Sequence, residues 1–142
     1  MEYIRERLTD KNDKAACDFA RQMAVESAES DKYLESIPLF ASLLQDRSSY
    51  VRTRAFGLIC SQARWAHDGQ IDAVFDQMVP LLNDPKPTVV RQSLAALHEV
   101  LLYRPEMSDR IEEAVDGIDV SKYKDSMSPL ITKDIEALKK EL

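Results

Sequence analysis

Glycine is scarce in this 142-residue chain, which contains only 3 such residues. Average usage of about 7% would give about ten. Glycine supplies the positive-φ backbone that β-hairpin turns and phosphate-binding loops require. The shortage therefore disfavours all-β folds and nucleotide-binding α/β folds. The length suits one domain, and an apolar content of 44% is sufficient for a globular core.

Cysteine and histidine are also rare. Cys17 and Cys60 form no C-x-x-C pair, and isolated thiols in apolar surroundings are commonly small buried hydrophobes. A disulfide between them would require facing Cβ vectors. His67 and His98 fall in different segments, whereas a metal site needs several ligands close together. We therefore predict buried, reduced cysteines, no metal site and no cofactor.

No apolar run approaches the 18 or so residues of a membrane span, and Met1–Arg7 lacks the apolar stretch of a signal peptide. The formal net charge of −6 argues against general binding to nucleic acid or to anionic membranes. The acidic excess lies in residues 65–142, with 9 Lys or Arg against 15 Asp or Glu, whereas residues 1–64 have 10 of each. These features favour a cytoplasmic protein.

Catalytic patterns are missing as well. The sequence has no G-x-S-x-G nucleophile elbow, no cysteine with an evident histidine partner and no glycine-rich phosphate loop. Glu112, Glu113 and Asp116 form an acidic cluster, which is more typical of a solvated helix face than of a cation site. The sequence thus leans away from an enzyme.

Apolar residues recur at intervals of three and four, which is the spacing of one helix face. This periodicity predicts helices over 33–44, 51–65, 71–82 and 89–103, with a last helix over 129–140 and a loop over 117–124. No stretch of alternating β-branched residues competes with these helices. The predicted class is all-α.

Turn and capping residues lie between these segments. Gly69, after Asp68, can adopt the left-handed conformation that ends helices. The prolines within 83–87 cannot continue a helix. Side chains able to accept a hydrogen bond from a free N–H at a helix start are Asp31, Ser48 or Ser49, and Thr88.

An internal repeat links two of the helix pairs. Residues 43–46 are followed by 51–52, and the similar residues 81–84 by 90–91, at offsets of 38 and 39 positions. A two-helix unit of this period is typical of an α-solenoid. We therefore expect a single domain over 1–142, with clear repeats over 32–66 and 70–104 and atypical terminal units over 1–30 and 106–142.

The second repeat resembles a HEAT repeat in the residues that carry that family's pattern. Pro80 lies near the end of the first helix, Asp84 in the turn, and Val90 and Arg91 at the start of the second helix. The first repeat has Asp46, Val51 and Arg52 at the matching positions, and no proline equivalent to Pro80.

The resemblance implies an armadillo-like, right-handed α–α superhelix of three to four antiparallel helix pairs. Proteins similar to this family include scaffolds, transport receptors, regulatory subunits and a few enzymes such as bilin lyases and alkyl-purine DNA glycosylases. The enzyme alternative would place an acidic residue such as Asp68 or Asp72 near basic groove residues.

The repeated Asp and Arg residues of the turns are predicted to be structural. A guanidinium at the first turn of a second helix can bind an Asp or a carbonyl in the turn of its own or the next unit. The four residues in this prediction are Asp46, Arg52, Asp84 and Arg91.

The face lined by the second helices is the predicted binding surface, because Arg, Trp and Tyr are enriched at interaction hot spots. The residues predicted to line a groove for a protein or peptide partner are Arg54, Arg64, Trp65, Tyr103 and Arg104. The alternative is that Trp65 packs against the Tyr103 end of the next helix. A third possibility, self-association through the stack ends, is moderated by the polar last helix, so we expect a monomer or weak homodimer.

Overall fold

The computed structural model describes residues 1–67 and 69–142, and within these residues it is helical with no strand. The prediction of an all-α fold is therefore confirmed. Eight α-helices are present in the described ranges: α1 Glu2–Leu8, α2 Asp13–Ser27, α3 Ile37–Ser42, α4 Ser49–Cys60, α5 Asp72–Met78, α6 Pro87–Tyr103, α7 Ser108–Asp116 and α8 Ser128–Lys139. Short 3-10 helices cover Leu34–Ser36, Val79–Asn83, Pro105–Met107 and Val120–Lys122.

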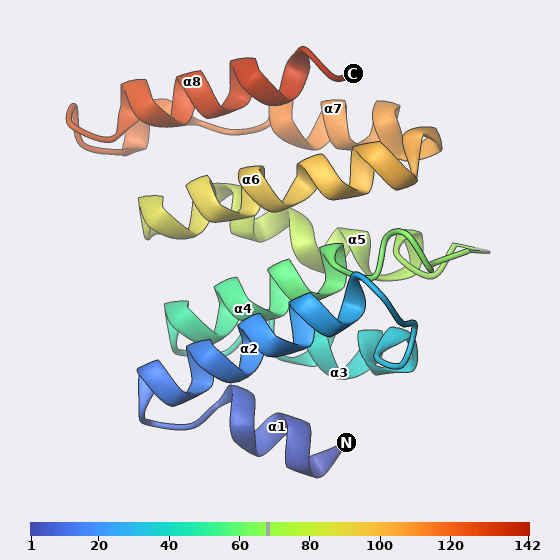
Figure 1. Ribbon diagram of the computed structural model, residues 1–142. Helices are drawn as coiled ribbons and strands as arrows, with labels where there is room; N and C mark the ends of the chain where they lie inside the picture. Colours follow the sequence, from blue (N-terminus) through green and yellow to red (C-terminus); the bar gives the residue numbers. More distant parts are fainter. Residues whose placement is uncertain (68) are drawn as a thin grey trace.

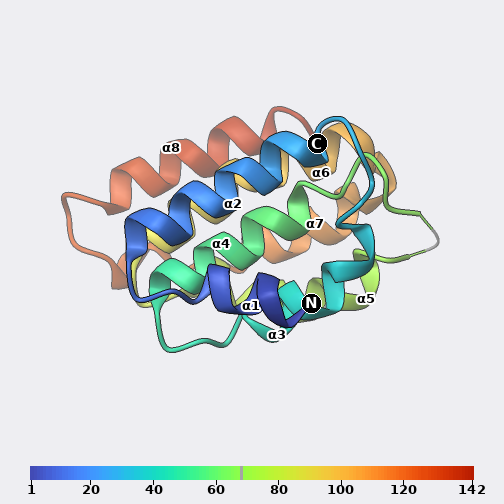
Figure 2. The ribbon, with the colours of Figure 1, turned by 60° about the horizontal axis from the view of Figure 1, so that its bottom comes forward.

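The helices follow one another in pairs. Helix α1 packs on α2, α3 packs on α4, and the 3-10 continuation of α5 packs on α6. The second helices of these pairs lie side by side in the order α2, α4, α6, with α8 next to α6, and all four run in the same direction (Figure 1). Figure 2 shows α3 and α5 on the other side of this row. The chain is thus a row of parallel second helices, backed by shorter first helices.

Side-chain caps begin two of the second helices. The Asn12 side chain accepts a hydrogen bond from the Ala15 N–H at 3.1 Å, at the start of α2. Ser48 accepts one from the Val51 N–H at 3.4 Å, at the start of α4. Of the two serines offered by the sequence, Ser48 is therefore the cap of α4.

Two other predicted caps are wrong. Thr88 lies inside α6, which begins at Pro87, because the fixed φ and missing N–H of proline suit the first helical position. Asp31 contributes its carbonyl oxygen rather than its side chain, accepting a hydrogen bond from the Leu34 N–H at 2.9 Å.

The predicted helix ends also need correction. The segment 33–44 forms a 3-10 turn followed by the short α3, and α4 ends at Cys60 rather than at residue 65. Helix α5 stops at Met78, and the chain tightens into a 3-10 helix around Pro80, which has no N–H to donate. Gly69 has the predicted positive φ, 76°, but it does not end α4, whose C-cap is Ser61. Asp68 before it lies outside the described residues.

The buried side chains form one continuous core from Leu8 in α1 to Leu138 in α8. Phe40, Phe56 and Phe75 are among its largest fully buried members. Each contributes roughly 1.5–3 kcal/mol of favourable transfer free energy. The core thus continues through every helix pair.

The two cysteines differ in environment. Both are free thiols, but only Cys60 is buried, and the prediction of a buried Cys17 is wrong because its side chain is half-buried on α2. Burial is the main cause that raises the pKa of the Cys60 thiol. Separately, among the helices in the described ranges, none has both the length and the apolar character to span a bilayer.

Candidate functional site

The turn between α3 and α4 is joined to the turn before α6 by a bidentate ion pair. The Arg52 Nε donates to Asp84 Oδ2 at 2.9 Å, and its Nη2 donates to Asp84 Oδ1 at 3.0 Å. The Arg52 Nη1 also donates to the Asp46 carbonyl at 2.9 Å and the Arg47 carbonyl at 3.2 Å. One guanidinium therefore connects two equivalent turns.

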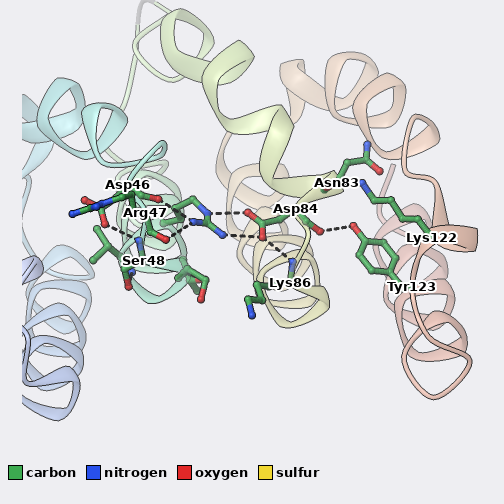
Figure 3. A network of polar contacts seen from close by, with 12 residues as sticks. Asp46, Arg47, Ser48, Asn83, Asp84, Lys86, Lys122 and Tyr123 are labelled. Carbon is green, nitrogen blue, oxygen red and sulfur yellow. Dashed lines mark hydrogen bonds and ion pairs between the residues drawn. The ribbon is translucent and has the colours of Figure 1, made fainter.

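Asp84 extends this network to the chain after α7 (Figure 3). Its Oδ1 accepts a hydrogen bond from the Lys86 N–H at 2.9 Å, which shapes its own turn. Its carbonyl oxygen accepts one from the Tyr123 hydroxyl at 2.7 Å. Burial, followed by the charge of Asp84, raises the pKa of Tyr123, which keeps this phenol protonated. Asp84 thus links three successive units, as a structural residue does.

Arg91 binds a different partner from the turn aspartate of its own unit. Its Nε donates to Asp134 Oδ2 at 2.7 Å, on α8, and its Nη2 donates to Asp134 Oδ1 at 3.3 Å. Asp46 uses its carboxylate to accept a hydrogen bond from the Ser48 N–H at 2.9 Å. The four predicted turn residues therefore all make contacts within the chain, but Asp84 pairs with Arg52 and not with Arg91.

Four of the five predicted groove residues gather where α4 and α6 end, and their polar groups bind other parts of the chain. The Trp65 Nε1 donates to the Ser27 carbonyl at 2.6 Å. The Arg64 Nη1 donates to the Ala28 carbonyl at 2.6 Å, and its guanidinium lies 4.8 Å from the centre of the Tyr103 ring. These contacts fasten the end of α2 to the next two units.

Arg104 completes this group with an inward contact of the same kind. Its Nε donates to the Ala63 carbonyl at 3.0 Å, and its Nη1 lies 3.6 Å from a Glu106 carboxylate oxygen. The contact with the Tyr103 ring is made by Arg64, and the Trp65 indole N–H binds the Ser27 carbonyl. The alternative that Trp65 itself packs against the Tyr103 end of the next helix stays a prediction.

Arg54 lies apart from these four residues. Its Nη1 donates to the Leu8 carbonyl at 3.1 Å, and its Nη2 lies 3.2 Å from Asp13 Oδ1. Its contacts lie at the end of α1 and the start of α2, whereas Arg64 and Trp65 donate to carbonyls at the end of α2. The prediction of one groove that contains all five residues is therefore corrected. The fold places Arg54 near the start of α2 and the other four residues near the ends of α4 and α6.

The face of the second helices carries a depression beside Arg54, towards the N-terminal ends of α2, α4 and α6. One hollow of about 520 Å³ crosses α2, α4 and α6, and a second of about 250 Å³ adjoins it. We call the two together the second-helix groove. Residues that line both hollows are Cys17, Arg21, Thr53, Arg54 and Gln92. The remaining lining residues are Asp13, Lys14, Ala20, Ala24, Ser49, Tyr50, Gly57, Leu58, Ser61, Thr88 and Val89.

Of the predicted site residues, only Arg54 lines the second-helix groove. The sequence carries a usable signal for the others, because Cys17, Arg21 and Ala24 recur at intervals of four and three beside the buried stripe of α2. Thr53 and Gly57 on α4 and its C-cap Ser61 recur at intervals of four. Small and polar residues repeated once per turn mark the helix face that is left open.

The second-helix groove is positively charged within an acidic chain. Its lining contains Lys14, Arg21 and Arg54 against Asp13, a formal sum of +2, whereas the chain carries −6. Lys14 forms an ion pair with Asp18 at 2.7 Å, and its hydrogen bond lowers the pKa of that carboxyl. Arg54 is tied to Asp13, so the cation left over in the groove is Arg21.

Two other hollows lie among the first helices. One of about 330 Å³ lies against Phe75 and Arg110, and the Arg110 side chain is held by Asp76 at 2.8 Å. Another of about 350 Å³ has an apolar lining that includes Ile37 and Val74. Both are bounded by residues that pack successive first helices together.

The enzyme alternative requires an acidic residue beside the basic groove residues, and Asp72 does not line the second-helix groove. Asp72 lies 3.4 Å from Arg110, on the side of the first helices, and Asp68 lies outside the described residues. The His98 Nδ1 contacts a carboxylate oxygen of Glu141, on the chain after α8. In residues 1–67 and 69–142, no group of three or more His, Cys, Asp or Glu could hold a metal ion. The acidic side chains Glu112 and Glu113 are exposed on α7.

Comparisons with protein-family models, curated proteins and solved structures found no match to this chain.

Proposed function

We propose that this chain is a small HEAT-like interaction module that binds a peptide segment of a protein partner along the second-helix groove. The observation that carries the proposal is the pair of adjoining hollows across α2, α4 and α6. Repeat proteins of stacked helix pairs commonly bind partners along such extended faces. The proposal includes a cytoplasmic, scaffold-type role for a monomer or weak homodimer.

The proposed HEAT-like architecture, an armadillo-like right-handed superhelix, is supported by the regular row of second helices. Equivalent turns are joined by the Arg52–Asp84 ion pair, which spans one repeat. A repeat that contacts only its neighbours needs links of this kind between units.

The dimensions of the groove fit a short extended peptide. Along α2 it reaches from Asp13 to Ala24, which is about 16 Å at 1.5 Å per residue. An extended chain rises about 3.3 Å per residue, so about five peptide residues fill this length. The floor is open at Gly57, where an added Cβ would have no described neighbour within 4 Å.

Gly57 provides the test, because a side chain there enters the groove without displacing the core. We expect peptides selected from a phage-displayed library on the wild-type chain to bind Gly57→Phe at least about tenfold more weakly, since the ring occupies space that the peptide needs. Gly57→Ala is the matched control and should bind as the wild type does. It should also be more stable by about 0.5–1 kcal/mol, because alanine loses less backbone entropy in a helix.

Selected peptides that bind Gly57→Phe as tightly as the wild type would contradict the proposal. Circular dichroism of each variant checks that the helices are intact. Ala24→Phe, which enters the same groove from α2, serves as a second obstruction.

A further inference from the structure

Resting on the proposed function, we infer that the ligand of the second-helix groove is an acidic peptide segment whose carboxylate binds the Arg21 guanidinium. Arg21 lines both hollows, so it lies where they join. Its side chain is exposed, and it forms no hydrogen bond or ion pair with any described residue. A guanidinium fork binds a carboxylate in bidentate fashion, which adds both strength and orientation.

No described carboxylate forms an ion pair with Arg21, although its charge helps Lys14 to lower the pKa of Asp18, one turn before Arg21 on α2. Lys14, about two turns before Arg21 on α2, already binds Asp18. Arg54 binds Asp13 and the Leu8 carbonyl. The two ion pairs hold Lys14 and Arg54 at the wall of the groove. There they line the groove, but their charges are already paired. Arg21 is therefore the group that a carboxylate would reach first.

Charge complementarity then selects the ligand. A groove with a formal sum of +2 in a chain of −6 attracts an anion locally while the rest of the molecule repels long polyanions. Nucleic acid binding draws its affinity from many phosphate contacts, and this groove offers one free guanidinium. A short acidic peptide fits this groove, because it is anionic, carries a carboxylate for the one free guanidinium, and is too short to be repelled by the rest of the molecule.

The apolar part of the groove indicates what lies beside the carboxylate. The smaller hollow continues from Arg21 over Ala20, Ala24 and Leu58, and the larger one reaches Tyr50, whose side chain is 62% exposed. Tyr50 is the exposed member of this apolar surface, since Ala20 and Ala24 are half-buried and Leu58 is buried. An exposed aromatic ring favours apolar contacts in a peptide site. We therefore expect an acidic residue with a leucine or aromatic residue within one or two positions.

The inference is tested by fluorescence anisotropy with two labelled octapeptides, one of six glutamates and two leucines, the other of six lysines and two leucines. The wild type should bind the acidic peptide more tightly, and the difference should shrink as salt rises. Arg21→Glu should weaken binding of the acidic peptide about tenfold or more, because a charge-assisted hydrogen bond becomes a repulsion. Lys140→Glu, an exposed charge reversal near the end of α8, is the matched control and should leave binding unchanged.

The outcomes separate the two proposals. Equal or tighter binding of the lysine peptide or of a ten-nucleotide single-stranded DNA, or an acidic peptide unaffected by Arg21→Glu, would overturn the acidic preference. In that case the peptide-binding function still stands if library-selected peptides lose binding in Gly57→Phe. If those peptides keep their binding, the function fails as well.

Discussion

At the scale of single residues, the Arg52 side chain forms a largely buried, bidentate ion pair. It shares two hydrogen bonds with Asp84, whose side chain is only 5% exposed. A carboxylate at such a site depends on its cation, because removal of one partner leaves a buried charge without compensation.

We expect Arg52→Ala to lower the free energy of unfolding by about 3 kcal/mol. Arg91→Ala is the matched comparison, since its partner Asp134 is 25% exposed and can be hydrated. It should cost about 1 kcal/mol or less. Urea denaturation of both variants measures the difference. Equal losses for the two variants would show that burial of Asp84 does not decide the strength of the link.

Glu99 gives the fold a pH dependence of its own. Burial raises the pKa of this carboxyl above its ordinary value of 4.5, and the charge of Arg64 offsets only part of that effect. The folded chain therefore binds this proton more tightly than the unfolded chain does. Glu99 therefore destabilises the fold when it is charged, at pH values above its folded pKa. This cost falls as the pH drops through the folded pKa towards 4.5, and it returns as the pH rises.

We expect Glu99→Gln to have a higher Tm than the wild type at pH 7, since the amide removes the cost of a half-buried charge. The difference should shrink towards pH 4, where the wild-type carboxyl is protonated in the folded chain. Thermal unfolding at several pH values measures it, with Glu113→Gln on the exposed face of α7 as the control. A constant difference across this range would exclude titration of Glu99 as its cause.

At the scale of helices, periodicity predicted which segments are helical, and local backbone chemistry decided where they end. The apolar spacing of 89–103 predicted α6 almost to its bounds, because a long helix with one buried stripe leaves little freedom. The segment 71–82 was harder, since Pro80 cannot donate a backbone hydrogen bond and converts the last turn of α5 into a 3-10 helix. Residues 61–65 look helical by spacing but form turns after α4.

The candidate site was less predictable than the helices, for reasons that involve contacts between units. Trp65 and Arg64 have the composition of a hot spot, yet both donate to carbonyls at the end of α2. Every residue has a backbone carbonyl, so the sequence does not show which carbonyls of a neighbouring helix pair lie within reach of Arg64 and Trp65. The Arg91–Asp134 pair was missed for a different reason: Asp134 is visible in the sequence, but it lies 43 residues away on α8 and outside any turn.

At the scale of the whole molecule, the second helices α2, α4 and α6 are each covered on one flank by the next second helix in the row. Helix α8 lies along α6, with Ile131 and Leu138 fully buried between the last units. Its other side carries charged residues such as Lys133 and Glu136, which are exposed. The last helix thus resembles the polar terminal units that keep stacked repeats soluble.

We expect a variant that ends at Arg104 to expose the flank of α6 that α8 covers and to lose the Arg91–Asp134 link as well. The exposed apolar flank should find a second copy, because a contiguous apolar patch on a soluble protein promotes association. Sedimentation velocity at several concentrations should show the shortened variant shifting to larger species. The full chain, with α8 in place, should change far less over the same range. A shortened variant that stays folded and monomeric throughout would mean that each helix pair is stable without cover from the next.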